Sequence, residues 1–377
     1  MYARSLKHQK HSFFLLGPRG TGKSTWLAQF FPQAKVINLL DESLYQSYLA
    51  DISLFYDSLK LLKPHSWVVV DEIQRLPNLL NEVHRLIEKQ KLRFALTGSS
   101  ARKLRKSGVN LLAGRAHRYY MYPFTPKELG QDFNLDQALC YGTIPLIQAQ
   151  GDKLSALNSY VQMYLKEEIK AEALVRNLPG FVRFLPVLAL YHGQIINTSS
   201  TARDAEVSRT TVNGFIEVLE DTLLLNKLPA YEARLRVREK KHPKIYWMDP
   251  GIVRTARKRT GPVTIEEKGS LFEGYVYMCL KVKMEYESAF DEISYWSSGT
   301  AKNIEVDFLL QNGSEFIAIE VKTTKKVKAE DLKGLKVISD LKGVKRRIFV
   351  YLGTTQMEKD GIEIMPFTVF CKKFLTV

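Results

Sequence analysis

Short apolar runs, separated by stretches of more polar sequence, mark the beginning of the chain. The runs lie at 13–16, 35–41, 67–72, 93–100 and 117–124. Nearly continuous apolar runs of this length are typical of strands that are buried on both faces of a parallel sheet, with helices between them. We therefore predict an α/β domain with a parallel sheet over residues 1–130.

The next part of the chain has the periodicity of helices. From residue 135 to residue 172 the apolar positions follow a helical spacing, and a Tyr-Gly-Thr-Ile-Pro segment at 141–145 interrupts it. Glycine and proline in such a segment end one helix before another begins. This pattern predicts a helical connector over residues 131–185, without chemistry of its own.

A helix-turn-helix pattern follows the connector. Residues 201–206 predict a short helix, and residues 209–221 predict a second one with Ser208 at its N-cap. The apolar positions of the second helix have helical spacing, and they are Val212, Phe215, Ile216 and Leu219. Two strand-like runs come next, at 223–228 and 234–247. We predict a winged helix-turn-helix over residues 186–260, with these strands as the wing.

Apolar and polar residues alternate with period two in the region 305–322, on both sides of Asn312-Gly313. Asn-Gly between two such runs is the strongest short-range signal for a β-hairpin. With these two residues as the loop, Leu309 pairs with Phe316. One face of the hairpin is then apolar, and it consists of Val306, Phe308, Leu310, Ile317, Ile319 and Val321.

The chain is basic and lacks the marks of a secreted or membrane protein. Its net charge is +15 and its pI is about 9.5, which favours a polyanionic partner, above all DNA. Basicity for solubility alone is the alternative. Cys140, Cys279 and Cys371 fit neither a disulfide framework nor a zinc spacing. No apolar run reaches the roughly 18 residues of a membrane span, so we expect a cytoplasmic protein without a membrane partner.

An octapeptide directly after the first apolar run has the pattern G-x-x-x-x-G-K-[ST] of a phosphate-binding loop. Its residues are Gly17, Pro18, Arg19, Gly20, Thr21, Gly22, Lys23 and Ser24, and Thr25 follows. In such a loop the backbone N–H groups point at phosphate oxygens, and the next helix adds its positive dipole end. We expect Lys23 to reach the β- and γ-phosphates of ATP, and Ser24 to hold Mg²⁺.

Two other runs end in groups that suit ATP hydrolysis. The third run ends at Asp71 and Glu72, at the carboxyl end of a parallel strand, where ligands bind in open α/β sheets. We expect Asp71 to hold the Mg²⁺ shell and Glu72 to polarise the attacking water. The fourth run contains Thr97 and Ser99, either of which could orient that water. We favour Ser99, with a helix-capping role as its alternative.

These motifs, in this order, resemble a prokaryotic branch of the AAA-type P-loop ATPases. The segments that carry the resemblance read GPRGTGKST, VVVDEIQRLP, LTGSS and LLAGR. Members of this branch pair the ATPase with a C-terminal region of unknown function. The resemblance implies that Arg115 is an arginine finger for a neighbouring subunit, and hence a homo-oligomer such as a hexameric ring. An ordinary surface arginine is the alternative, and no clear second-sensor arginine follows Gly130.

The predicted helix-turn-helix offers polar side chains to a nucleic-acid groove. Its second helix begins with residues that would face the groove, namely Arg209, Thr210, Thr211 and Asn213. Basic residues alternate on the strand predicted after it, and they could contact phosphates. They are Arg234, Arg236, Arg238 and Lys240. The alternative is a winged helix that binds protein and whose polar strand face is merely solvated.

The polar face of the predicted hairpin carries Asp307, Glu320 and Lys322, with Glu320 diagonal to Asp307. Two carboxylates that bind Mg²⁺, beside a lysine that steadies the attacking water, would cut phosphodiesters. This arrangement resembles the PD-(D/E)xK nuclease fold, a restriction-endonuclease-like α/β fold, here over residues 261–377. The resemblance implies a further acidic metal ligand on a preceding helix, and Glu273 supplies it. A domain kept for DNA grip or packing alone is the alternative.

The sequence therefore predicts an AAA-type protein that hydrolyses ATP and acts on DNA by binding or remodelling it. Metal-dependent cleavage of DNA, gated by ATP, is a second hypothesis, and it requires Asp307, Glu320 and Lys322 to act together. A third hypothesis is an ATP-dependent regulatory switch or protein remodeller whose nuclease-like domain is inactive.

Overall fold

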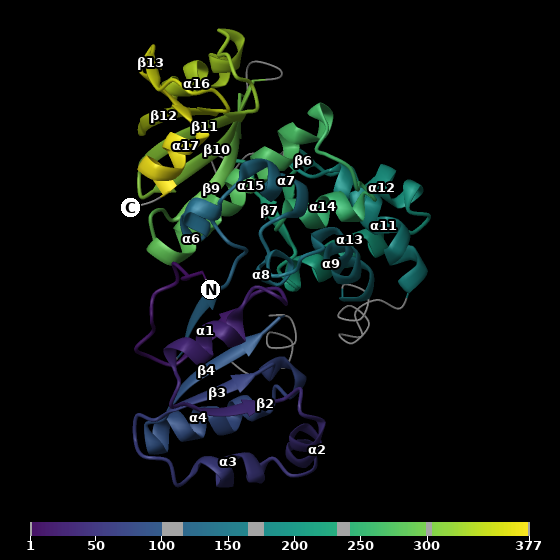
Figure 1. Cartoon of the computed structure of the whole chain (residues 1–377), viewed down its shortest axis with the longest axis vertical. Coiled ribbons are helices and arrows are strands. Elements are labelled where there is room, and N and C mark those ends of the chain that lie inside the picture. The colour runs from purple at the N-terminus through teal and green to yellow at the C-terminus, as the bar shows by residue number, and fades with distance from the viewer. Residues whose placement is uncertain (1, 100–115, 165–176, 232–241, 299–303, 376–377) are drawn as a thin grey trace. The chain divides into compact units, whose positions relative to one another are not determined.

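A computed structural model describes residues 2–99, 116–164, 177–231, 242–298 and 304–375 (Figure 1). The chain forms two compact units. The first consists of residues 3–122 with 221–223, and the second consists of residues 123–220 with 224–377. The predicted connector, helix-turn-helix and hairpin thus lie almost entirely within one unit. The boundaries predicted between those three parts stay predictions.

The first unit is built on a parallel sheet of five strands in the order β2-β3-β4-β1-β5. The strands are β1 (Phe13–Leu16), β2 (Lys35–Asn38), β3 (Trp67–Asp71), β4 (Arg93–Gly98) and β5 (His117–Tyr120). Each strand lies within one of the predicted apolar runs, so the predicted parallel α/β fold is confirmed. Because parallel strands end at the same edge, the residues that follow β1, β3 and β4 come together there.

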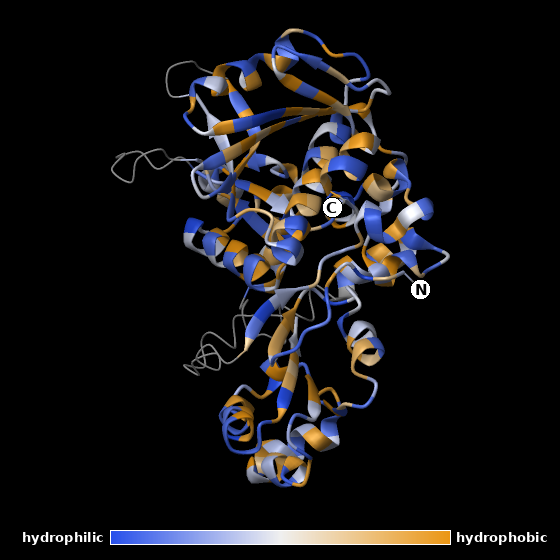
Figure 2. Ribbon diagram, turned by 90° about the vertical axis from the view of Figure 1, so that its left-hand side faces the viewer, coloured by the Kyte–Doolittle hydropathy of each residue, from blue (hydrophilic) through white to orange (hydrophobic). Residues whose placement is uncertain are grey.

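Helices connect these strands and cover the sheet. They are α1 (Lys23–Phe30), α2 (Glu42–Ala50), α3 (Ser53–Leu59) and α4 (Leu79–Gln90). In α4 the buried residues Leu79, Leu80, Val83 and Leu86 lie on one face, and they join Val68, Val70, Phe94 and Leu96 of the strands in one core. Figure 2 shows hydrophobic and hydrophilic residues side by side on such helices, as expected where only one face is buried.

Several helices belong to the second unit. They are α6 (Pro126–Leu129), α7 (Leu135–Tyr141), α8 (Pro145–Gln148), α9 (Lys153–Ser159), α11 (Leu178–Leu190) and α14 (Pro250–Ala256). The predicted interruption after Tyr141 is confirmed, because Gly142 has a φ of 72° and ends α7. Thr143 N donates to Oδ2 of Asp249, the N-cap of α14, at 2.7 Å. Burial raises the pKa of Asp249 to about 7.

Two helices lie where the helix-turn-helix pattern was predicted. α12 (Thr198–Asp204) begins and ends earlier than the predicted residues 201–206, whereas α13 (Arg209–Asp221) has the predicted bounds. The N-cap role of Ser208 is confirmed, since its Oγ accepts from Thr211 N at 3.1 Å. The apolar face of α13 is buried. A small sheet in the order β6-β8-β7 accompanies these helices; β6 (Gln194–Ile195) precedes them in the chain, and β7 (Leu225–Leu228) and β8 (Lys244–Trp247) follow them. Strands β7 and β8 are antiparallel. The basic positions 234, 236, 238 and 240 lie outside the described residues.

The C-terminal part of the second unit contains a sheet of six strands in the order β13-β14-β12-β11-β10-β9. Its strands are β9 (Glu292–Ser297), β10 (Glu305–Asn312), β11 (Glu315–Lys322), β12 (Val344–Tyr351), β13 (Met357–Lys359) and β14 (Ile362–Pro366). The helices beside it are α15 (Ile265–Glu287), α16 (Lys333–Val337) and α17 (Phe367–Phe370). β11 is antiparallel to β10 and parallel to β12.

The hairpin of β10 and β11 forms, but the predicted register was wrong. Leu309 pairs with Ala318 instead of Phe316, so the loop is Gly313-Ser314 and not Asn312-Gly313. Gly313 takes the positive φ of 57° at the first loop position, as in a type II′ turn, whereas an Asn-Gly turn would demand a positive φ of asparagine. The pairing shifts by an even step, so each residue keeps its predicted face.

Two further expectations concern the cysteines and the membrane. Cys140, Cys279 and Cys371 are free thiols, as their spacing predicts. Within the described part of the chain, no helix combines the length and the apolar character that crossing a bilayer requires.

Candidate functional site

The phosphate-loop motif spans the turn between β1 and the first residue of α1, in the strand–loop–helix arrangement that the motif needs. Gly20 and Gly22 have φ of 78° and 89°, a conformation that other residues rarely adopt. A Cβ on Gly17 would come within 2.5 Å of the Met121 carbonyl oxygen. The backbone path of this loop therefore depends on glycine at all of these positions.

Lys23 lies against the loop that precedes it. Its Nζ donates to the carbonyl oxygens of Gly17 at 2.6 Å and Pro18 at 3.1 Å, and its side chain is buried. Thr21 Oγ1 also donates to the Pro18 carbonyl, at 2.7 Å. The side chains of Lys23 and Thr21 thus form hydrogen bonds with backbone carbonyls of their own loop. Arg19, Ser24 and Thr25 are exposed.

The strand edge brings the predicted magnesium ligands together. Ser24 Oγ donates to Asp71 Oδ2 at 2.8 Å, although the two residues come from different elements. Thr97 Oγ1, at the end of β4, donates to the other oxygen of Asp71. Hydroxyl and carboxylate oxygens are ligands that Mg²⁺ prefers. Ser24 and Asp71 therefore fit the role of holding Mg²⁺ beside bound nucleotide.

Glu72 adopts an unusual backbone conformation at this edge. Its φ of 60° is left-handed, which costs about 1–3 kcal/mol for a residue other than glycine, and such strain is common at functional sites. Glu72 N donates to Thr97 Oγ1 at 3.1 Å. Its carboxylate accepts from Gln74 Nε2 and, at 3.5 Å, from Ser99 Oγ. The structure thus places Ser99 beside Glu72, while Thr97 contacts both acidic residues.

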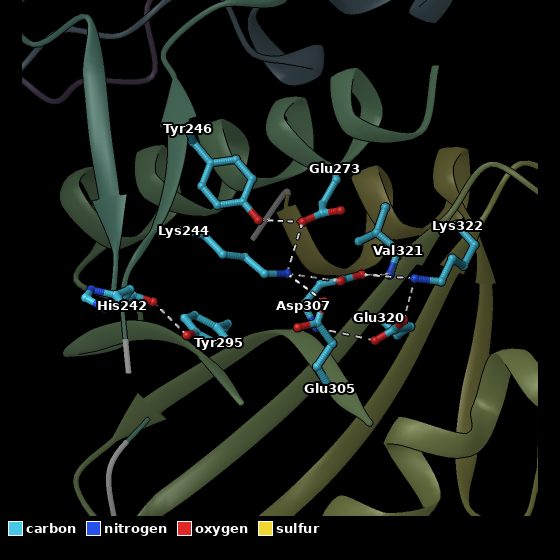
Figure 3. A network of polar contacts seen from close by, with 10 residues as sticks. All are labelled: His242, Lys244, Tyr246, Glu273, Tyr295, Glu305, Asp307, Glu320, Val321 and Lys322. Carbon is cyan, nitrogen blue, oxygen red and sulfur yellow. Dashed lines mark hydrogen bonds and ion pairs between the residues drawn. The ribbon is translucent and has the colours of Figure 1, made fainter. Parts of the chain in front are cut away.

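The four residues of the predicted nuclease site also lie together, in the second unit (Figure 3). Asp307 of β10 is joined to β11 by two bonds: Val321 N donates to its Oδ2 at 2.8 Å, and its own N donates to Glu320 Oε2 at 3.3 Å. Lys322 Nζ lies 2.5 Å from Glu320 Oε1 and 3.8 Å from Asp307 Oδ2. The corrected register explains this closeness, because Phe308 pairs with Ile319, and Asp307 and Glu320 are the next residues of the two strands.

Burial and mutual charge shift the pKa values of this cluster. Burial, then Asp307, raises the pKa of Glu320 to about 8, against the opposing charge of Lys322. For Lys322 burial acts in the other direction, but Asp307 and Glu320 outweigh it and raise the pKa of its ammonium. Both carboxylates therefore favour the charged form of Lys322, whereas burial disfavours the charged form of Glu320.

Glu273 reaches the same cluster from α15, as the resemblance implied. Tyr246 of β8 donates its hydroxyl to Glu273 Oε1 at 2.5 Å. Burial, then Asp307, raises the pKa of Glu273 to about 7, and the charge of Lys244 opposes this. Tyr246 is a site residue that the sequence did not indicate.

Lys244 was also missed, and it occupies the middle of the cluster (Figure 3). Its Nζ lies 2.9 Å from Glu305 Oε1, 3.8 Å from Glu273 Oε1 and 4.0 Å from Asp307 Oδ1, and only 6% of its side chain is exposed. Burial would favour the neutral amine, but Glu273, Asp307 and Glu305 together raise the pKa of Lys244. The three carboxylates therefore favour the charged form of Lys244 in this site.

The cluster, as it is arranged, does not fit a divalent metal. Across the ranges that the structure describes, no group of three or more His, Cys, Asp or Glu side chains could hold a metal ion. The oxygens of Glu273 and Asp307 face an ammonium instead. The metal-ligand roles of Glu273, Asp307 and Glu320 accordingly stay predictions.

The start of α13 is open to solvent, as a groove-reading helix would require. Arg209, Thr210 and Asn213 are exposed, and Thr211 is half-buried. Arg209 and Asn213 line a pocket of about 700 Å³, with Lys227 of β7 and His242 on its wall. Arg209, Lys227 and His242 thus surround one opening in this part of the second unit, together with the acidic Glu217.

Comparison with known families divides the chain into three parts. Residues 9–130 match the family described as an AAA domain. They are similar to AAA-type P-loop domains. Residues 132–262 and 268–370 match two domains of unknown function, DUF8612 and DUF4143. The family match supports an ATPase, and it leaves the role of the remaining parts open.

Uncharacterised proteins of other organisms are similar in sequence to most of this chain. An uncharacterised protein of Mycobacterium tuberculosis is 25% identical, over 85% of this chain and 72% of its own length. One from Methanocaldococcus jannaschii is 27% identical, over 89% and 80%. Among solved structures, the Aeropyrum pernix ORC1 protein in complex with DNA has a TM-score of 0.34 at 14% identity, covering 67% of this chain and 87% of that one. A likeness that low carries no argument about function.

The predicted arginine finger and a buried glutamine both belong to the segment 9–130. Arg115, the predicted arginine finger, lies outside the described residues, so its role and the ring that it implies stay predictions. Gln74 was not singled out in the sequence, yet it is buried and donates to both Glu72 and Ser99. Its place in the segment VVVDEIQRLP, just after the acidic pair, was the available signal.

Proposed function

We propose that this protein is an AAA-type ATPase that acts on DNA, with ATP turnover in the first unit and DNA contacts in the second. The observation that carries the ATPase part is the meeting of Ser24, Asp71, Glu72 and Ser99 at one strand edge, beside the phosphate loop. Ser24 and Asp71 would supply two ligands to Mg²⁺, and Glu72 would supply the general base for phosphoryl transfer.

The DNA part rests on charge and exposure. The chain carries a net charge of +15. The first turn of α13 presents Arg209, Thr210 and Asn213 to solvent, next to Lys227. Arginine and asparagine at the start of a recognition helix are suited to base edges, whereas lysine is suited to phosphates.

The test is ATP turnover and DNA binding measured in parallel on one panel of single-stranded, duplex and branched DNA. We expect at least one DNA form to bind and to stimulate turnover, with an affinity that falls as salt rises. Lys23→Ala should abolish ATP binding without removing DNA binding. An absence of both binding and stimulation at modest salt would overturn the DNA part and leave the ATPase part standing.

Substitutions in α13 test whether this helix contacts the DNA. Arg209→Ala should weaken DNA binding by about 1–3 kcal/mol, if its guanidinium contacts a base. Arg203→Ala is the matched control, because Arg203 is an exposed arginine of α12 that pairs with Asp204. Equal effects of the two variants would show that only general charge matters, and would argue against α13 as the reading helix.

A protein remodeller or regulatory switch is the second candidate function. It is favoured by the ammonium of Lys244 among the carboxylates, which makes the nuclease-like part a poor metal site. Glu72→Gln protein should trap ATP and recover a stable protein partner free of nucleic acid. Recovery of DNA instead, together with stimulated turnover in the panel, would exclude this candidate.

A further inference from the structure

The carboxylate cluster already contains its own cations. Four carboxylates, those of Glu273, Glu305, Asp307 and Glu320, lie within 4.0 Å of one of two ammonium groups. Lys322 pairs with Glu320, and Lys244 lies next to Glu273 and Glu305. Every carboxylate of the predicted nuclease site therefore has a lysine as its neighbour.

Lys244 is held in place by the strand that carries it. β8 is the central strand of its sheet, and all of its residues are buried. Tyr246, two residues along and thus on the same side of the strand, donates to Glu273 and stacks on Tyr277 with ring centroids 4.6 Å apart. The ammonium also lies 5.4 Å from the centre of the Tyr295 ring. Lys244 is therefore a fixed part of the interior.

We propose that Lys244 is the resident cation of this cluster and that it keeps divalent metal ions out. The ammonium of Lys244 lies where a metal ion bound to Glu273, Glu305 and Asp307 would have to lie. A metal ion that approached these carboxylates would therefore be repelled by the positive charge already there. In this conformation the carboxylate cluster thus binds no metal ion and does not cut phosphodiesters. The proposal stands independently of ATP hydrolysis and of DNA binding.

The experiment is a titration of the full-length protein with Mn²⁺ alone, in the absence of nucleotide, followed by electron paramagnetic resonance. The Asp307→Asn variant serves as the baseline, because the difference between it and the wild type counts only ions held at this cluster. We expect no such difference. One Mn²⁺ per wild-type chain that is lost in Asp307→Asn would overturn the proposal.

A second arm removes the ammonium. Lys244→Met should bind one Mn²⁺ at least tenfold more tightly than the wild type, and the ion should raise its melting temperature. Both effects should vanish in the double variant Lys244→Met/Asp307→Asn. The control is Lys345→Met, which removes an exposed lysine that pairs with Glu315 on the same sheet, and it should bind no ion.

A Lys244→Met protein that folds but gains no ion would show that the lysine does not exclude the metal, and the proposal would fall. Should this variant not fold, Lys244→Arg retains the positive charge. The arginine variant and the wild type must then both match the Asp307→Asn baseline. A bound ion in either one would contradict the inference.

Discussion

Replacement of Thr97 by valine isolates the contribution of one hydroxyl to the nucleotide site. Thr97 is fully buried, and its Oγ1 donates to Asp71 and accepts from Glu72 N. Valine has nearly the same shape but forms neither bond. A hydrogen bond to a charged group contributes about 1.5–3 kcal/mol, and a buried N–H that loses its acceptor costs about 1–3 kcal/mol. We therefore expect a loss of about 2.5–6 kcal/mol in the stability of the first unit.

The matched control is Thr97→Ser, which keeps the hydroxyl and loses one buried methyl group, at a cost of about 1 kcal/mol. The assay is hydrogen exchange of the β4 amides in the full-length protein, and a loss of about 2.5–6 kcal/mol speeds exchange by about 70-fold or more. ATP turnover should also fall by about tenfold or more in Thr97→Val, because both acidic residues lose their positioning bond. Equal exchange and equal turnover in the two variants would refute this reasoning.

Two further predictions concern the second unit. Gly142→Ala should destabilise it by about 2–4 kcal/mol, because a Cβ would lie 1.7 Å from Asp249 Oδ1 at a φ of 72°; thermal unfolding measures this, and Gly151→Ala, with open space around it, should have almost no effect. Burial lowers the pKa of His192 to about 3, and its Nδ1 accepts from Trp247 N. As pH falls, this histidine therefore takes up a proton in the unfolded chain at a higher pH than in the folded protein. From pH 7.5 to pH 5 the free energy of unfolding should fall by about 2 kcal/mol more than in His192→Asn. Urea unfolding at both pH values measures this difference. An identical pH dependence in the two proteins would contradict this.

The sequence predicted those features that depend on local pattern. Apolar runs located the parallel strands, and the spacing of glycines around Lys23 located the phosphate loop, because both constraints act within a few residues. The alternation of β10 and β11 placed Asp307 and Glu320 on one face even though the loop was misplaced, since a shift by an even number of residues preserves the faces.

The parts that could not be predicted depend on contacts distant in the sequence. A lysine at the start of a strand is usually solvated, so nothing in the letters around Lys244 indicated that it would be buried against Glu305 and Asp307. The bonds of Thr97 to Asp71 and Glu72, and of Gln74 to Ser99, depend on the pairing of β3 with β4, which the sequence alone does not specify. Polar residues inside a fold acquire their roles from neighbours that only the folded chain provides.

The placement of β8 has a consequence for dissecting this protein. Its lysine and tyrosine belong to the segment 132–262, whereas the acids that they meet belong to the segment 268–370. A fragment cut between these segments would expose an unneutralised acidic interior and fold poorly, if at all. The same dependence would penalise recombination that exchanged either segment alone, so that the two should be inherited as a pair.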